Sequence, residues 1–397
     1  MYLILATCYP CLLSFVFPPS SIVYFFSKSC LQHHTIIYQL CIMQEDEKIK
    51  GRGAQLHTNN KYQQYQYVTE HIEGLDEPLI DGSRETKIYT ENPKKIVNHV
   101  ESPDVYGMYS INSYQGCEHG CIYCYARPTH EYWGYNAGLD FERNIIVKHN
   151  APDLLRSFFD KKSWKPNVIN VSGNTDCYQP IERKLKITRQ LLEVFLEYKN
   201  PVGMITKNSL ILRDLDILKQ LAQLNLVHVM VSITSLDENL RRLMEPRTAS
   251  SLNRLKVLEI LSKNNISCGV MTAPIIPGLN SSEVPEILKA AAEHGARNAG
   301  YTIVRLNGPN EAIFHDWIHK HFPNKANKVW NLIKECHGGK VSDSRFRVRM
   351  RGEGATADSI AQLFNLSVKK YFKGPKATAL DCSIFERPSK HGQMKLL

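Results

Sequence analysis

Short apolar segments alternate with longer segments of helical periodicity between about residue 106 and residue 310. The candidate strands span residues 108–114, 167–173, 202–207, 227–234, 267–275 and 299–306. They are uniformly apolar, which is typical of parallel strands buried on both faces. The segments between them have apolar residues three and four positions apart, which predicts helices, and two open on serine, a favoured cap. These helices span residues 180–198, 210–224, 250–264 and 281–295.

Six strand–helix units in a row predict a parallel sheet with right-handed crossovers, either doubly wound or rolled into a barrel. Polar residues recur at the carboxyl end of nearly every predicted strand. In α/β barrels the active site is assembled at that face from several strands, so this pattern favours the barrel. We therefore expect an α/β fold with a partial (β/α)6 TIM-like barrel over residues 106–310.

The flanking regions have different patterns. Residues 43–105 are polar and turn-rich, which predicts an irregular N-terminal segment. Residues 311–397 predict a small C-terminal extension with helices near 311–322 and 327–338. Within it, arginines alternate with apolar residues, so a strand there would present four guanidinium groups on one face. These would contact phosphate or protect a sheet edge, and they are Arg345, Arg347, Arg349 and Arg351.

Residues 1–42 are apolar, with one lysine, Lys28, and no acidic residue. Pro10, Pro18 and Pro19 interrupt every apolar run before it reaches the roughly 20 residues of a spanning helix. Polar sequence begins abruptly at Met43. We expect residues 1–42 to be a non-native extension; a membrane anchor or export signal is the alternative.

The net charge of +10 fits polyanionic partners without identifying one. Eleven cysteines in a 397-residue chain rich in helix and strand patterns exclude a small secreted disulfide framework. We expect a cytoplasmic monomer that does not bind membranes.

The segment "GCEHGCIYCYARP" places Cys117, Cys121 and Cys124 in one loop after the first strand. Structural zinc needs four ligands, and only His119 in the same loop could complete the set. A [4Fe–4S] cluster normally takes four thiolates, so three leave one iron open for a small molecule. An iron–sulfur cluster fits better than zinc. The alternatives are a structural zinc site and a non-catalytic iron–sulfur protein for electron transfer or sensing.

The C-x3-C-x2-C spacing, with Tyr123 before the last cysteine and a first barrel strand before the loop, resembles the radical S-adenosylmethionine (radical SAM) superfamily. "KGRGAQ", "SGNTDCYQPIE", "ITKNSLILRDLDIL", "VSITSLDENLRRLMEPRTASSLNRL" and "TAPIIPGLN" resemble the branch that contains spore photoproduct lyase and its uncharacterised relatives. The resemblance implies that the three cysteines hold the cluster and that S-adenosylmethionine chelates the fourth iron. It also implies an external electron donor of the flavodoxin or ferredoxin type and a 5′-deoxyadenosyl radical that abstracts hydrogen from a substrate.

The same resemblance implies the contacts to S-adenosylmethionine. The loop "SGNTD" would meet the methionine amino group, with Thr175 supplying the hydroxyl, and Lys207 would meet the carboxylate. Ser232 would form a hydrogen bond to the cosubstrate, and Ala273 would line the adenine side. The implied cofactor-binding residues are Tyr123, Gly173, Asn174, Thr175, Lys207, Ser232 and Ala273.

One position departs from the lyase pattern. The lyase carries a cysteine in this loop that returns a hydrogen atom to the product radical, and Gly173 occupies that position here. Cys177 lies four residues further on, and we expect it to point elsewhere. Direct photoproduct repair is therefore not expected, although hydrogen abstraction is. By the resemblance to this branch, nucleic acid is the first candidate substrate.

Overall fold

The computed structural model describes residues 49–62, 85–104, 108–375 and 377–388, together with strands β1 (Thr7–Cys8) and β2 (Cys11–Leu12). The chain divides into two units, Met1–Lys48 and Ile49–Leu397. In the first unit β1 and β2 pair antiparallel. The remaining expectations for residues 1–42 lie outside the described residues. All that follows concerns the second unit.

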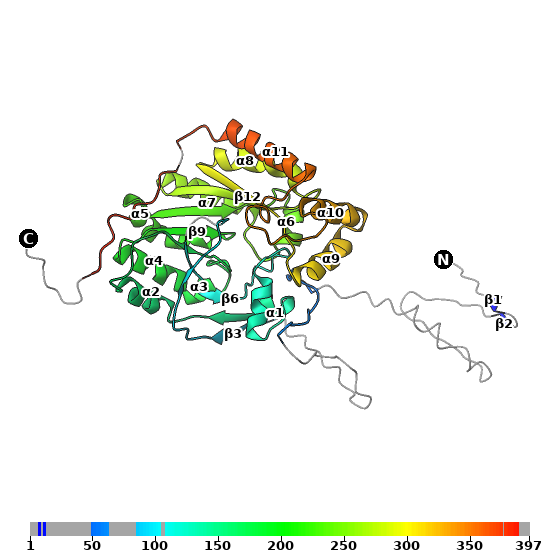
Figure 1. The fold of residues 1–397 in the computed structure, drawn as a ribbon, viewed down its shortest axis with the longest axis horizontal. Helices are drawn as coiled ribbons and strands as arrows, with labels where there is room; N and C mark the ends of the chain where they lie inside the picture. Colours follow the sequence, from blue (N-terminus) through cyan, green and yellow to red (C-terminus); the bar gives the residue numbers. More distant parts are fainter. Residues whose placement is uncertain are drawn as a thin grey trace, which may run out of the picture. The chain divides into compact units, whose positions relative to one another are not determined.

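Seven strands of the described part form one sheet, and six of them are the predicted barrel strands (Figure 1). These six are parallel and adjacent in chain order, and β4 pairs antiparallel at the edge. The structure confirms the expected partial barrel: the strands form one sheet that does not close on itself. Its order is β12 (Asn298–Ile303), β11 (Ser267–Ile275), β10 (Val227–Ser232), β9 (Val202–Thr206), β8 (Ile169–Val171), β5 (Tyr109–Ile111) and β4 (Val97–His99).

The two faces of the sheet differ, which corrects the expectation of uniformly apolar strands. In β10, Val227, Val229 and Val231 are buried in the main hydrophobic core, whereas His228 and Met230 between them are only partly buried. Because successive side chains of a strand point to opposite faces, the valines face the helices and the other two face the inside of the barrel.

The outer face of the sheet is covered by helices. Figure 1 shows α2, α4, α5, α7 and α8 along this side, and Leu191, Leu218, Leu258 and Leu288 place four of these helices in the core. The helices of the barrel region are α2 (Ala151–Phe159), α3 (Glu182–Leu185), α4 (Ile187–Glu197), α5 (Leu215–Gln223), α6 (Glu238–Met244), α7 (Ser251–Lys263) and α8 (Val284–Glu293).

Three predicted helices differ in detail. The helix expected over 180–198 is divided into α3 and α4 at Lys186, whose φ of 54° is left-handed. The segments 210–224 and 281–295 begin as the 3-10 helices η2 (Ser209–Asp214) and η3 (Ser281–Glu283). Ser250 caps α7 as expected, but Ser281 does not cap a helix and instead accepts a hydrogen bond from the Gly278 amide.

A second, three-stranded sheet was not predicted. It consists of β3 (Lys87–Thr90), β7 (Asn144–Val147) and β6 (Tyr114–Gln115), in that order. With β4 it gives regular structure to part of the segment 43–105 that was expected to be irregular. The helices η1 (Arg127–Trp133) and α1 (Leu139–Arg143) lie between β6 and β7 in the chain. This region surrounds the cysteine loop.

The C-terminal extension contains α9 (Asn310–His321), α10 (Pro323–Cys336) and α11 (Ala355–Tyr371). The first two were predicted, and α11 packs on α8 (Figure 1). The expected arginine strand at 345–351 is wrong, because these residues form turns in which the Arg349 amide donates to the Arg345 carbonyl. In the described part of the chain no helix meets the length and apolarity that a membrane crossing requires.

Candidate active site

The cysteine loop is folded against the carboxyl end of the sheet. Cys117 and Cys121 are 7% and 8% exposed, and the partly buried Cys124 packs against the apolar groups that contain each of them. The Cys117 amide donates to the Phe141 carbonyl at 2.8 Å. The Cys124 carbonyl accepts from the side chain of Asn310 at 2.9 Å. The three thiols therefore lie in one enclosed region, and all three are free.

His119 does not join these thiols. Its Nδ1 lies 3.4 Å from Oδ2 of Asp176, and its Nε2 lies 3.2 Å from Nδ2 of Asn208. Both ring nitrogens are thus engaged by other residues. Within the described part of the chain, no three His, Cys, Asp or Glu side chains are arranged round a single metal ion.

Burial dominates the electrostatics of the thiols. It raises the pKa of Cys117, Cys121 and Cys124, and in Cys117 the other two cysteines raise the pKa further. The positive charge of Lys207 acts in the opposite direction on Cys121 and Cys124. Because thiolates, and not thiols, bind metal, loading of the site must release protons. Burial and neighbouring negative charges make the Cys117 and Cys121 thiolates unfavourable, and a bound cation would supply the missing positive charge.

A buried ion pair stabilises the backbone of the cysteine loop. Arg127 in η1 and Glu142 in α1 are fully buried and lie 2.5 Å apart. Arg127 also donates twice to the Cys121 carbonyl, at 2.9 and 3.1 Å. Glu142 accepts from the amides of Gly53 and Ala54 at 3.1 and 2.8 Å. This pair connects the "KGRGAQ" segment to the cysteine loop.

Gly53 touches the cysteine loop so closely that a side chain does not fit. A Cβ atom built on Gly53 would lie 1.9 Å from the carbonyl oxygen of Gly120. We expect Gly53→Ala to lower the free energy of unfolding by about 1–3 kcal/mol, because two backbone segments must separate. Chemical denaturation measures this. Gly374→Ala is the control, because nothing lies within 4 Å of its Cβ position, and it should change stability by less than about 0.5 kcal/mol. Equal effects of the two changes would contradict the close packing.

Tyr123 connects the loop to a second buried charge. Its hydroxyl donates to Oε1 of Glu245, which also accepts from Thr234 at 2.8 Å. Arg254 pairs with Oε2 of the same carboxylate. Burial alone would raise the pKa of Glu245, but Arg254 and Lys207 lower it to about 2. The loop is therefore held from the side of α6 and α7 by an ionised carboxylate.

The "SGNTD" loop lies beside the cysteine loop. Nδ2 of Asn174 donates to Gln115 and Thr129, both at 3.1 Å, and the Thr175 hydroxyl donates to the Tyr114 carbonyl at 2.9 Å. The Gly173 carbonyl accepts from the hydroxyl of Tyr125, the residue after Cys124, at 2.7 Å. The loop thus contacts residues on both sides of the three cysteines.

Asp176, the last residue of that loop, organises the next strand end. Its carboxylate accepts from the Lys207 amide at 2.7 Å and from the Thr206 hydroxyl at 2.8 Å. Burial alone would raise the pKa of Asp176, but His119 lowers it to about 2. The backbone of Lys207 is therefore held beside the cysteine loop. The Nζ atom of its side chain lies 5.9 Å from the ring centroid of Tyr123.

Ser232 and Ala273 lie at the same edge of the sheet. Ser232 pairs in register with Met271, two residues before Ala273. The Ser232 carbonyl accepts from Arg254 at 3.0 Å, which connects it to the carboxylate that holds Tyr123. Cys177 lies in the main core at 3% exposure.

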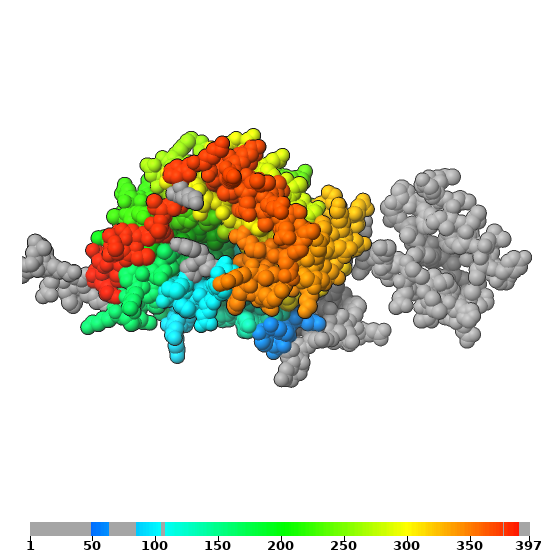
Figure 2. Space-filling view, turned by 45° about the horizontal axis from the view of Figure 1, so that its top comes forward, coloured from blue at the N-terminus to red at the C-terminus, as the bar shows by residue number. Residues whose placement is uncertain are grey.

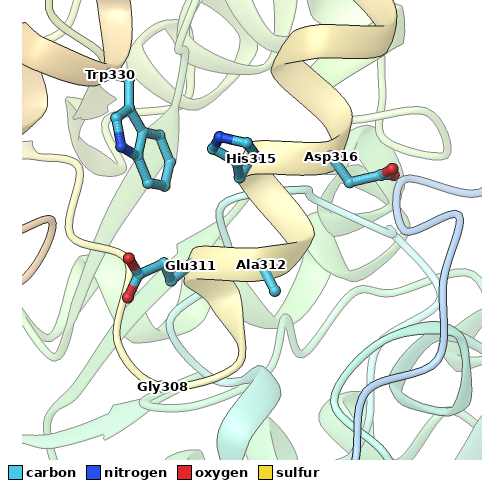
Figure 3. Close-up of a pocket in the computed structure, with 6 residues that line it drawn as sticks. All are labelled: Gly308, Glu311, Ala312, His315, Asp316 and Trp330. Atoms are coloured by element: carbon cyan, nitrogen blue, oxygen red, sulfur yellow. The ribbon is translucent and has the colours of Figure 1, made fainter. Parts of the chain in front are cut away.

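A separate hollow of about 640 Å³ lies between α9 and α10 (Figure 3). Glu311, His315 and Asp316 of α9 and Trp330 of α10 line it. None of the predicted cofactor-binding residues lines it, so we do not assign it to the cofactor site.

Comparison with known families decides what this site belongs to. The family model "Radical SAM superfamily" matches residues 111–291, which include the three cysteines and the strand ends from β5 to β11. An uncharacterised protein of Mycobacterium tuberculosis is 31% identical over 228 residues, covering 57% of this chain and 67% of the relative. The chain belongs to the radical SAM superfamily. An uncharacterised protein of Methanocaldococcus jannaschii is 32% identical over 186 residues, covering 47% of this chain and 66% of that protein.

The fold of this radical SAM protein is shared with spore photoproduct lyase. A mutant of that lyase matches with a TM-score of 0.50 at 14% identity, covering 72% of this chain and 79% of the lyase. Both the superfamily and this fold were expected from the sequence. The chain is thus an enzyme whose chemistry begins with cleavage of S-adenosylmethionine, and the superfamily uses a [4Fe–4S] cluster and an external reductant for this step.

Several supporting residues were missed in the sequence. The sequence did not indicate that three charged pairs support the site; these are Arg127–Glu142, Glu245–Arg254 and His119–Asp176. The sequence signal for them was weak, because a charged residue is far more often exposed than buried. "KGRGAQ" was noted, but its contact with the loop was not predicted.

Proposed function

We propose that Cys117, Cys121 and Cys124 hold a [4Fe–4S] cluster whose fourth iron binds S-adenosylmethionine. The supporting observation is the set of three free, enclosed thiols in one loop, next to a histidine that other residues already engage. When bound, the cluster supplies the electron that cleaves S-adenosylmethionine to methionine and the 5′-deoxyadenosyl radical. The surrounding residues position the cosubstrate and exclude water.

The cosubstrate contacts follow from the strand ends. Lys207 is half-buried, and among the described residues it forms no salt bridge. A carboxylate of the cosubstrate would satisfy this charge. The Thr175 hydroxyl donates its hydrogen to Tyr114, so its oxygen remains free to accept from an ammonium group. In this proposal Ser232 binds the cosubstrate, Ala273 lines the adenine, and Tyr123, Gly173 and Asn174 complete the contacts.

We expect Lys207→Met to weaken binding of S-adenosylmethionine by about 10- to 100-fold, because it removes a charge-assisted hydrogen bond. Equilibrium dialysis with the reconstituted protein measures this. Lys256→Met on the exposed face of α7 is the control and should bind normally. Iron content should be unchanged in both variants. Normal affinity in the Lys207 variant would remove this residue from the proposed site.

The proposed substrate is nucleic acid. The net charge of +10 and the arginine-rich turn 345–351 support a polyanionic substrate, as does the resemblance to the photoproduct lyase branch. Gly173 stands where that lyase has its hydrogen-returning cysteine, and Cys177 is buried in the core. We therefore propose hydrogen abstraction from nucleic acid and do not propose repair of a photoproduct.

Deuterium transfer tests this function. Anaerobically reconstituted protein with dithionite and S-adenosylmethionine should release 5′-deoxyadenosine. With a sugar-deuterated oligonucleotide present, mass spectrometry should find deuterium in that product. Release without deuterium, across DNA and RNA oligonucleotides labelled at each sugar and base position, would exclude nucleic acid as the substrate while leaving the cleavage reaction intact. No release at all would contradict the proposed site.

A further inference from the structure

The turn 345–352 lies at the carboxyl edge of β12. The amide of Ile303, the last residue of this strand, donates to the Met350 carbonyl at 2.9 Å. Arg305 follows two residues later, on the same edge as the cysteine loop. The extension thus brings arginines from distant parts of the chain to the rim of the candidate active site. Figure 2 shows this part of the extension, in orange, beside the cyan surface near residue 100.

The acidic residue at this rim is already engaged. Oδ2 of Asp104 accepts from Nε of Arg349 at 2.6 Å, and its Oδ1 accepts from the Arg347 amide at 2.5 Å. The exposed Arg345 differs from the other arginines of this rim because its charge is neutralised. Its guanidinium lies 2.5 Å from a carboxylate oxygen of Asp343 and 2.5 Å from one of Glu353. The rim therefore has an excess of positive charge, because Asp104 is a single negative charge beside three arginines, Arg305, Arg347 and Arg349.

Neither the Arg305 nor the Arg347 side chain forms a salt bridge within the described residues, but Arg347 is exposed to water and Arg305 is not. Arg305 is half-buried, and within the described chain it forms no salt bridge or hydrogen bond through its side chain. Burial and the charge of Arg349 lower its pKa, whereas Tyr125 and Asp104 act in the opposite direction. A desolvated guanidinium beside a second guanidinium is unfavourable without a counter-ion. Among the described residues no carboxylate pairs with Arg305, so an anion from outside would satisfy this charge.

Exposed aromatic rings lie next to these cations. Tyr125, the residue after Cys124, is 48% exposed. Phe346 is 54% exposed, and the guanidinium of Arg349 lies 4.5 Å from its ring centroid. Exposed rings beside arginines are typical of surfaces on which the bases of a single strand stack while its phosphates pair with the cations.

We propose that Arg305, with Arg347 and Arg349, binds a backbone phosphate of a single-stranded nucleic acid whose neighbouring bases stack on Tyr125 and Phe346. This inference rests on the proposed function and assigns its substrate-binding residues. Arg305 acts here as a substrate-positioning residue, because its partner is the phosphate and not the reacting hydrogen. A phosphate held beside Tyr125 brings an adjacent sugar or base toward the cysteine loop.

The test is binding of a fluorescein-labelled 12-nucleotide DNA strand to the reconstituted protein, measured by anisotropy at several salt concentrations. We expect Arg305→Gln to weaken binding about tenfold or more and to reduce the salt slope by about one. Arg305→Lys should recover part of the affinity. Arg345→Gln is the control: it removes one positive charge from the same turn, but its charge is already neutralised, so affinity should change less than about threefold.

Two outcomes would overturn the inference: equal affinities for Arg305→Gln and Arg345→Gln, or no binding by the unmodified protein. Thermal unfolding of each variant separates lost binding from lost folding. Arg305→Gln should be at least as stable as the unmodified chain, because it removes a half-buried charge that pairs with no carboxylate of the described residues. Release of 5′-deoxyadenosine is measured in parallel on the unmodified protein. If the protein releases 5′-deoxyadenosine but does not bind the oligonucleotide, only the proposed phosphate site is excluded. If it releases no 5′-deoxyadenosine, the proposed cofactor site is contradicted.

Discussion

A Cys121→Ala chain is expected to lose both the cluster and the cleavage of S-adenosylmethionine. The thiol lies in the enclosed loop with Cys117 and Cys124, and no other described cysteine belongs to that loop to replace it. Iron should fall from about four atoms per chain to fewer than about one, with loss of the broad visible absorbance of the cluster. Release of 5′-deoxyadenosine should fall to the level of the protein-free mixture. Iron analysis, absorbance and chromatography measure these effects.

Cys382→Ala is the matched control. Cys382 is a free, partly exposed cysteine in the C-terminal segment, and its removal should leave iron content and cleavage unchanged. Cys121→Ala should still fold, because Arg127 pairs with Glu142 and donates to the backbone carbonyl of residue 121, and the substitution leaves both contacts in place. Retention of about four irons by the Cys121→Ala chain would contradict the proposed ligand set.

The Glu142→Gln chain is expected to lose about 3–5 kcal/mol of its free energy of unfolding. The change leaves Arg127 fully buried without its counter-charge, and it weakens the acceptor for the amides of Gly53 and Ala54. Urea denaturation measures the loss. Limited proteolysis should show earlier cleavage in the segment 50–55, because this segment is held by the carboxylate.

Glu197→Gln is the control for this change. Glu197 pairs with Arg156 at 3.0 Å, but both side chains are more than a third exposed. Water and salt screen such pairs, so the loss should be about 0–1 kcal/mol. If Glu142→Gln is no more destabilising than this control, the buried pair does not support the cysteine loop as inferred.

Much of the fold was predictable because it repeats. Each strand of the barrel is a short apolar run followed by a turn and a helix, so six independent local signals agree on one topology. The boundaries were less predictable where the backbone departs from a regular helix, as at Lys186. The prediction of a strand at 345–351 was wrong for a related reason. Strict alternation in the sequence indicates a strand, but hydrogen bonds to Asp104 and Ser102, from a distant segment, stabilise these residues as turns.

The sequence by itself determined the parallel α/β fold, the cysteine loop and the edge of the sheet on which the polar residues meet, because these depend on spacing along the chain. Only the tertiary structure decided which charges lie under the loop, that His119 turns to Asp176 and Asn208, and that no carboxylate of the described residues pairs with Arg305. These features depend on contacts between residues that lie nine to 89 positions apart in the chain. A charged side chain carries no local mark of whether it will be buried with a partner, buried alone or left in water.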